Sequence, residues 1–237
     1  MATGKIGRRC LIPVDAIPSA GIIRTNQSVL KMSPRNPAET KTKLLAAARD
    51  VIRAKGYTAT TVDDICAVAG VTKGGFFHHF AGKEQLGIAA AEHFDEMATA
   101  LFAAAPYRAF ADPRDRVLGY VDFRAAMLAG DIPQYTCLLG TMVQEVYDTH
   151  PELAAACDRG MSSHVRELAR DIAAAKERYA SDAPWSAESV GYHMQAVLQG
   201  AFIFTKAKHD PAVAKECLTH LRRYLEALFP ITSNHTH

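Results

Sequence analysis

The sequence predicts an all-α protein, and three observations support this prediction. Apolar residues recur every three or four positions over long stretches, which is the period of a helix. Strictly alternating patterns, which are typical of half-buried strands, are absent. The prolines that follow Pro37 are widely spaced, and each is placed to end one helix or to open the next. We expect about nine helices from these signals.

Composition is that of an ordinary globular protein. Hydrophobic residues make up 49% of the 237 residues and charged residues 22%, which is enough apolar material for a sizeable core. No uncharged apolar run approaches the length of a membrane span, and Pro13, Asp15 and Pro18 interrupt the N-terminal apolar stretch, unlike a signal peptide. The five cysteines are scattered without metal-ligand spacing. We therefore expect a cytoplasmic protein with no membrane partner, no metal and no other cofactor.

Charge is distributed unevenly along the chain. Residues 1–85 are net positive, and residues 86–237 are net negative. A basic first third is typical of a segment that meets a polyanion such as nucleic acid.

The N-terminal region is expected to begin with an irregular segment. Prolines and glycines interrupt residues 1–37, which predicts a flexible basic extension. A first helix is expected over residues 40–55, where Leu44 and Ile52 lie on one apolar stripe. Gly56 is placed to end that helix, because glycine readily adopts the left-handed conformation of a C-terminal cap.

A short second helix is expected next. Thr61 is a suitable N-terminal cap, and Asp63 and Asp64 follow in the first turn, where the helix dipole favours acidic side chains. Gly70 then provides a turn, and a third helix is expected over residues 73–79.

The third helix has its own cap and core residues. Thr72 precedes it, and Phe76 and Phe80 are spaced to face the core. Gly82 then interrupts the pattern, and a long fourth helix is expected over residues 83–105.

Two short helices joined by a tight turn and braced by a preceding helix predict a helix-turn-helix. Such a motif places one helix in the major groove of DNA, where the residues at its N-terminus reach the base edges. The pattern alone leaves open an ordinary helical hairpin within a core.

The residues themselves favour the DNA-binding interpretation. The sequences GYTATTVDDI at 56–65, AGVTKGGFFHHF at 69–80 and KE at 83–84 closely resemble the DNA-binding segment of the TetR family of transcriptional repressors. The close resemblance covers about residues 40–87, and the remainder is similar only in length and helical layout. It implies an all-α fold with an N-terminal three-helix DNA-binding domain at 38–85 and a helical ligand-binding and dimerisation domain at 86–232.

The resemblance also implies which residues contact double-stranded DNA. Thr60 and Thr61 would donate hydrogen bonds to phosphate from the start of the second helix. Thr72 and Lys73 would enter the groove, and Lys73 would read guanine edges.

Further contacts are implied on and after the third helix. Gly74 and Gly75 would let the backbone approach the bases closely. His78 and Lys83 would contact phosphates. Phe77 departs from the family, which commonly has tyrosine there, so it would pack on sugar without donating a hydrogen bond.

The larger domain is expected to contain five further helices, at 113–130, 134–149, 152–180, 186–208 and 211–229. The family commonly dimerises through its last two helices, and a twofold dimer suits the reading of two half-sites. The resemblance places the homodimer interface on the apolar stripes of these helices, and we expect it at Val197, Gly200, Ala201, Phe204, Leu221, Tyr224 and Leu228.

The resemblance implies a small-molecule effector pocket among the inner helices, where polar residues are interspersed with apolar ones. Such a pocket is expected to be mostly apolar with few polar anchors. The expected lining residues are Tyr120, Phe123, Met127, Cys137, Met142 and His193.

Other functions were weighed on the same residues. The chain contains no nucleophile elbow, phosphate-binding loop, metalloprotease motif or dinucleotide fingerprint, so neither catalytic residues nor an enzyme function are predicted. A helical interaction protein would not need Lys73 and Lys83 around a Gly-Gly helix start. The favoured function is a repressor released from its operator by a small molecule. The alternative is an electrophile-sensing regulator that acts through Cys137.

Overall fold

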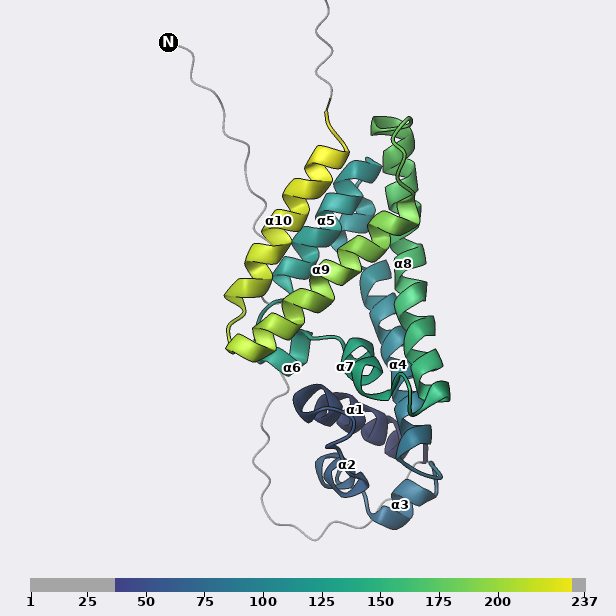
Figure 1. Cartoon of the computed structure of the whole chain (residues 1–237). Helices are drawn as coiled ribbons and strands as arrows, with labels where there is room; N and C mark the ends of the chain where they lie inside the picture. Colours follow the sequence, from purple (N-terminus) through teal and green to yellow (C-terminus); the bar gives the residue numbers. More distant parts are fainter. Residues whose placement is uncertain (1–36, 232–237) are drawn as a thin grey trace, which may run out of the picture. The chain divides into compact units, whose positions relative to one another are not determined.

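The computed structural model describes residues 37–231, and over this range the chain is helical, with no strand (Figure 1). The all-α prediction is confirmed. The elements are α1 (Pro37–Lys55), α2 (Val62–Ala69), α3 (Lys73–Phe77), α4 (Lys83–Ala103), the 3-10 helix η2 (Pro106–Ala109), α5 (Pro113–Ala126), α6 (Ile132–Tyr135), α7 (Leu138–Val146), α8 (Pro151–Tyr179), α9 (Ala187–Lys208) and α10 (Ala212–Leu228).

The N-terminal extension and a membrane span were also considered in the sequence. The predicted flexible extension lies outside the described residues except for Pro37, which is the first residue of α1. Among the described helices, none is long and apolar enough to cross a membrane.

The predicted helix over residues 134–149 is wrong as a single element. Thr136 adopts an extended conformation between α6 and α7, with φ −82° and ψ 157°. Cys137 then caps α7, because its Sγ accepts a hydrogen bond from the Gly140 N–H at 3.4 Å. Cysteine is not among the usual capping residues, so this break has no clear signal in the residues around it. The 3-10 helix η2, which opens at Pro106, was also not expected.

The cap predictions are confirmed at the start of the chain. Thr61 and Asp64 form a reciprocal capping box at the start of α2, and Thr72 Oγ1 accepts from the Gly75 N–H at 3.2 Å at the start of α3. Gly56, after α1, has a φ of +89°, which favours glycine.

The body of the molecule is organised around α8, a helix of 29 residues that contacts α4, α5, α7 and α9. The last two helices pack against each other, and α10 also packs against α5. Figure 1 shows α9 crossing in front of α5 to reach α10. The core between these helices is apolar and fully buried at Met194, Leu198 and Leu225.

A second core joins the first three helices to the body. Leu44 of α1, Ile65 of α2 and Phe76 of α3 are each 0% exposed, as are Met142 of α7 and Leu153 of α8, and all five belong to one cluster. Because α7 and α8 complete the core of the helix-turn-helix, a movement of either helix would change the packing of α1–α3.

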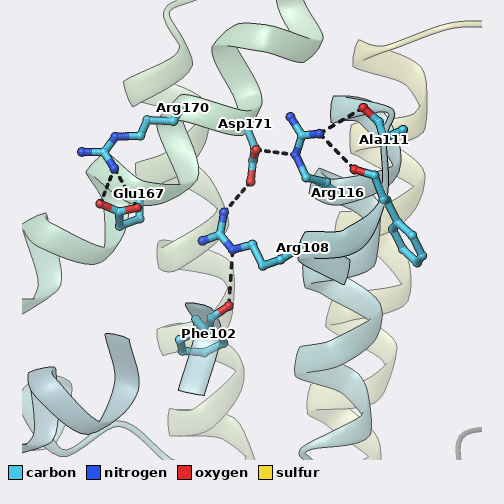
Figure 2. A network of polar contacts seen from close by, with 8 residues as sticks. Phe102, Arg108, Ala111, Arg116, Glu167, Arg170 and Asp171 are labelled. Carbon is cyan, nitrogen blue, oxygen red and sulfur yellow. Dashed lines mark hydrogen bonds and ion pairs between the residues drawn. The ribbon is translucent and has the colours of Figure 1, made fainter. Parts of the chain in front are cut away.

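A polar network holds the segment after α4 against α8 (Figure 2). The Asp171 carboxylate accepts from Arg108 Nη1 at 2.8 Å and from Arg116 Nε at 2.7 Å. Arg108 Nε also donates to the carbonyl of Phe102, near the end of α4, at 3.3 Å. The three ionic side chains are 14–27% exposed, so they lie largely out of water. This network fixes the C-terminal end of α4 against α8.

Candidate functional site

The helix-turn-helix is built from local hydrogen bonds that the sequence supplies. Gly70 ends α2 in the left-handed conformation, with a φ of +63°, and Thr72 opens α3 two residues later. Gly75 is required by space, since a Cβ there would lie 2.9 Å from Val71 Cγ1. Phe76, which is 0% exposed, anchors α3 on the core.

The start of α3 is open to solvent. Thr72, Lys73 and Gly74 are exposed, as are His78 and the ring of Phe77, which is 56% exposed. Lys73 Nζ lies 2.9 Å from Asp63 Oδ1 of α2, and this ion pair raises the pKa of Lys73. The surface that α3 presents is therefore glycine-rich and accessible, with the Lys73 ammonium at its start held beside Asp63, as a helix that enters a DNA groove requires.

Two residues expected at phosphates have different surroundings. Thr60 is 1% exposed, and its hydroxyl donates to the Gly56 carbonyl at 2.6 Å. Lys83 Nζ points at the loop between α1 and α2, where it donates to the carbonyls of Tyr57 at 3.2 Å, Thr58 at 3.4 Å and Thr60 at 3.1 Å. An ammonium has three donors, so these carbonyls account for all of them. Both residues stabilise the loop that precedes α2.

A carboxylate from the body holds the same loop. Glu145 of α7 accepts from the backbone N–H of Tyr57 at 3.0 Å and from that of Thr58 at 2.7 Å. A side chain at Gly56 would displace the Glu145 carboxylate from this position, because a Cβ there would overlap it. Glu145 thus couples α7 directly to the loop that positions α2.

A cavity of about 920 Å³ lies between α1 and the helices of the body. Side chains of α1, α4, α5, α6, α7, α8 and α9 line it, so the helix-turn-helix and the body both contribute. A cavity of this size accommodates a small organic molecule.

Comparison with known proteins identifies the architecture. The family profile described as "Bacterial regulatory proteins, tetR family" matches residues 44–90, and "Tetracyclin repressor-like, C-terminal domain" matches residues 113–221. Together these matches span more than half of the chain. The chain belongs to the TetR family of transcriptional regulators.

Individual relatives agree with this assignment. The HTH-type transcriptional repressor NemR of Escherichia coli (strain K12) is 24% identical over 152 residues, which is 62% of this chain and 74% of the relative. A TetR-family transcriptional regulator from Agrobacterium tumefaciens has a similar fold, with a TM-score of 0.70 at 21% identity over 82% of this chain and 100% of that one. The crystal structure of reduced E. coli NemR gives a TM-score of 0.67 at 21% identity, over 82% of this chain and 99% of the other. This TetR-family protein is a DNA-binding transcriptional regulator, and the relatives named here are regulators too.

The cavity of this regulator contains only part of the set expected from the sequence. Met127 and Cys137 line it. Tyr120 is buried beside it, where its hydroxyl bonds His164 Nε2 and accepts from Gln195 Nε2, both at 2.9 Å. His164 and Gln195 line the cavity themselves, so Tyr120 positions lining residues.

The other three expected pocket residues lie elsewhere. Phe123 is half-buried and packs its ring on Phe102 and Tyr107. Met142 is 0% exposed in the core beneath the helix-turn-helix. His193 is exposed on α9, with its ring 4.8 Å from that of Tyr224. The period of a helix does not distinguish a face that packs on a neighbour from one that borders a cavity, which explains these errors.

The pocket residues expected from the sequence did not include Arg53 and Arg124, two of the three arginines that line the cavity. Arg53 is 8% exposed although it belongs to the helix-turn-helix, and Arg124 of α5 stacks on Phe102 and Phe202. Burial lowers the pKa of Arg53 to about 10, with a further contribution from the charge of Arg49. The available signal was a basic residue in register with the apolar stripe of α1, one position after Ile52.

The residues expected at a dimer interface divide into two groups. Ala201 and Leu221 are 2% and 3% exposed within one chain, so they belong to its own core. Phe204 is 58% exposed and Tyr224 is 41% exposed, and nothing lies within 4 Å of a Cβ built on Gly200. Val197, Gly200 and Leu228 are half-buried at the edge of that core.

Proposed function

We propose that this TetR-family regulator is a repressor that binds a double-stranded DNA operator as a homodimer and is released by a small-molecule effector. The main observation behind the proposal is that the start of α3 is exposed to solvent. Lys73 precedes two glycines there, and buried Phe76 packs the helix against the core. The large cavity between the helix-turn-helix and the body supports the effector. Because the partner is DNA, we place the protein in the cytoplasm.

The two proposed domains have the bounds expected from the sequence. Residues 38–85 are the DNA-binding domain, and 86–232 are the ligand-binding and dimerisation domain. The proposed DNA contacts are Thr61, Thr72, Lys73, Gly74, Gly75, Phe77 and His78. Thr60 is removed from this set because it is buried, and Lys83 is removed because its three donors bond carbonyls of the loop before α2. The contribution of Thr60 and Lys83 to DNA binding is to hold that loop. Thr61 is kept because it is exposed, although its hydroxyl donates to Asp64 Oδ2 at 2.6 Å in the DNA-free protein.

The proposed dimer uses the outer faces of α9 and α10. Exposed apolar side chains gather there, including Ile203 at 48% and Phe204 at 58% exposure. Gly200 leaves room for a partner helix to approach closely. A twofold axis at this surface would present two α3 helices to two half-sites.

A salt titration tests the function. Genomic fragments retained by the purified protein supply the operator, and fluorescence anisotropy measures its affinity over a series of salt concentrations. We expect a steep negative slope of log affinity against log salt, because phosphate contacts release counterions. A slope near zero, or no retained fragment, would refute DNA binding by this surface.

Cys137 supports the alternative effector chemistry. Its thiol lines the cavity and caps α7, so alkylation would disturb both. NemR, the relative named above, was crystallised in a form described as reduced. If Cys137 is the sensor, Cys137→Ser should abolish release from operator by an alkylating agent such as N-ethylmaleimide. If the effector binds reversibly, as we propose, the same variant should keep its response to that effector.

A further inference from the structure

The cavity contains two arginines without a counterion. Arg53 of α1 and Arg124 of α5 both line it, and neither forms a hydrogen bond or ion pair with any residue that the structure describes. Arg53 is 8% exposed, and its guanidinium lies 5.7 Å from the centre of the Phe94 ring. A buried guanidinium without a partner is unfavourable, because it has lost water and gained no acceptor.

The cavity also gathers positive charge. Burial is the main cause that lowers the pKa of Arg53, and the charge of Arg124 adds to it. Burial likewise lowers the pKa of Lys206, with a further contribution from the charge of Arg53. Three cationic side chains from α1, α5 and α9 therefore raise the electrostatic potential in one region. An anion placed there would relieve the repulsion.

The neighbouring carboxylates are committed elsewhere. Asp50 pairs with Arg49 at 2.7 Å, and Glu145 accepts from the two backbone amides of the loop before α2. Asp95 lies against Gly160 of α8, and Asp131 caps α6. Asp50, Asp95 and Asp131 all line the cavity, but none forms an ion pair with Arg53 or Arg124 among the described residues. The charge of Asp50 only partly offsets the lowering of the pKa of Arg53.

A buried hydroxyl without a hydrogen-bond partner belongs to another residue of the cavity lining. Thr136, the extended residue between α6 and α7, is 1% exposed and lines the cavity, and its Oγ1 has no hydrogen-bond partner among the described residues. Buried hydroxyls are usually paired. The remainder of the lining is largely apolar: Phe94, Leu101, Phe102, Met127, Leu139 and Met161.

We propose that the effector is an organic carboxylate, held by its anionic group between Arg53 and Arg124 and by its apolar part against the aromatic and aliphatic lining. Guanidinium groups match the planar carboxylate with paired hydrogen bonds. This inference rests on the proposed function, since it names the chemical class of the effector.

The two arginines would let a bound ligand couple the DNA-binding domain to the body. Arg53 belongs to α1 of the DNA-binding domain, and Arg124 belongs to the body. A carboxylate that engages both ties the two parts together and favours the one arrangement in which both arginines reach it. A ligand shifts a conformational equilibrium only by such a difference in affinity.

A matched panel of ligands tests the charge. Benzoate, cinnamate and decanoate are each compared with the corresponding neutral amide, by the thermal midpoint of the full chain and by operator affinity. We expect at least one carboxylate to raise the midpoint and weaken operator binding, with the amide at least tenfold less potent. Equal potency of acid and amide, or no response to any carboxylate, would overturn the proposal.

Variants of the two arginines test the site. Arg124→Met and Arg53→Met should abolish the preference for the carboxylate over its amide, while Arg170→Met, at an exposed position on α8, should leave it unchanged. Arg53→Met should also raise the thermal midpoint of the ligand-free protein, since an unpaired buried charge is removed. Retention of the full carboxylate response in both cavity variants would contradict the assignment.

Operator binding by the ligand-free protein distinguishes a failure of the proposed function from a failure of the carboxylate inference. If the ligand-free protein binds no DNA, the proposed function fails. If it binds operator and responds only to neutral molecules, the proposed function stands and the carboxylate inference fails.

Discussion

His164 illustrates how the cavity controls the protonation of a single residue. Its Nε2 lies 2.9 Å from the Tyr120 hydroxyl, and burial lowers its pKa to about 3, with smaller contributions from the charges of Arg124 and Arg108. The histidine is therefore neutral in the folded protein at every physiological pH.

This shift predicts a pH dependence of stability. The unfolded chain binds a proton at His164 below about pH 6.5, whereas the folded chain binds it only near pH 3. The free energy of unfolding therefore falls as the pH falls through this window, by about 2 kcal/mol between pH 7 and pH 5 from this residue. His164→Gln should remove this part of the slope in urea unfolding measured at both values.

The matched control is His220→Gln, at an exposed position on α10. A His164→Gln protein with the same difference between pH 7 and pH 5 as wild type would show that His164 is not held neutral by the fold.

Roles that depend on nearby residues could be predicted from the sequence, whereas roles that depend on distant contacts could not. Thr61 and Thr72 were assigned correctly as caps, because a cap depends on neighbours within three residues. Lys83 was expected at a phosphate, but its partners lie 23–26 residues earlier in the chain. Such a contact depends on how the first helices pack, which one sequence without its fold does not specify.

At the scale of elements, α7 links the cavity to the DNA-binding helices. Its first turn begins at the cavity residue Cys137, and its last turn carries Glu145, which holds the backbone of Tyr57 and Thr58. A displacement of α7 by ligand would therefore reach the loop before α2 within one short helix. The sequence predicted neither end of this element, since it expected a single helix over 134–149.

Removing the carboxylate tests this link. Glu145→Ala should expose the amides of Tyr57 and Thr58 to faster hydrogen exchange and lower stability by about 1 kcal/mol, since two charge-assisted hydrogen bonds near the surface are lost. Exchange of these amides is followed by NMR.

Gln144→Ala is the matched control, because Gln144 is a neighbouring exposed residue that bonds only within its own helix, to the Gly140 carbonyl. If both variants leave the two amides equally protected, Glu145 does not hold the loop.

At the level of the whole molecule, the proposed homodimer rests on the exposed apolar side chains of α9 and α10. Phe204 is 58% exposed there, and its replacement should not disturb the core of one chain. Phe204→Glu should therefore yield a folded monomer by sedimentation velocity, with operator affinity reduced at least tenfold because only one half-site is read at a time.

Tyr147→Glu is the control, since Tyr147 is 74% exposed just after α7, away from the proposed interface. A Phe204→Glu protein that remains dimeric would move the interface to another surface.

The architecture itself was largely predictable from sequence. Helix existence follows from apolar period, caps and proline spacing, and the three helices of the DNA-binding motif also follow a family pattern. The cavity was not predictable, because Arg53 and Arg124 lie 71 positions apart and meet only through the packing of α1 and α5 on the body. Likewise, Ala201 and Leu221 share an apolar stripe with surface residues, and only the fold shows that they face inward.

Sequence reading by α3 is tested by comparing Lys73→Ala with Arg170→Ala, which removes an exposed cation from α8, outside the proposed dimer surface. Anisotropy titrations with operator and with random duplex measure both affinities. If α3 reads bases, Lys73→Ala should lose affinity at least about tenfold on operator and much less on random DNA, while Arg170→Ala should match wild type on both. Equal losses on operator and random DNA, or no loss at all in Lys73→Ala, would contradict sequence reading by α3.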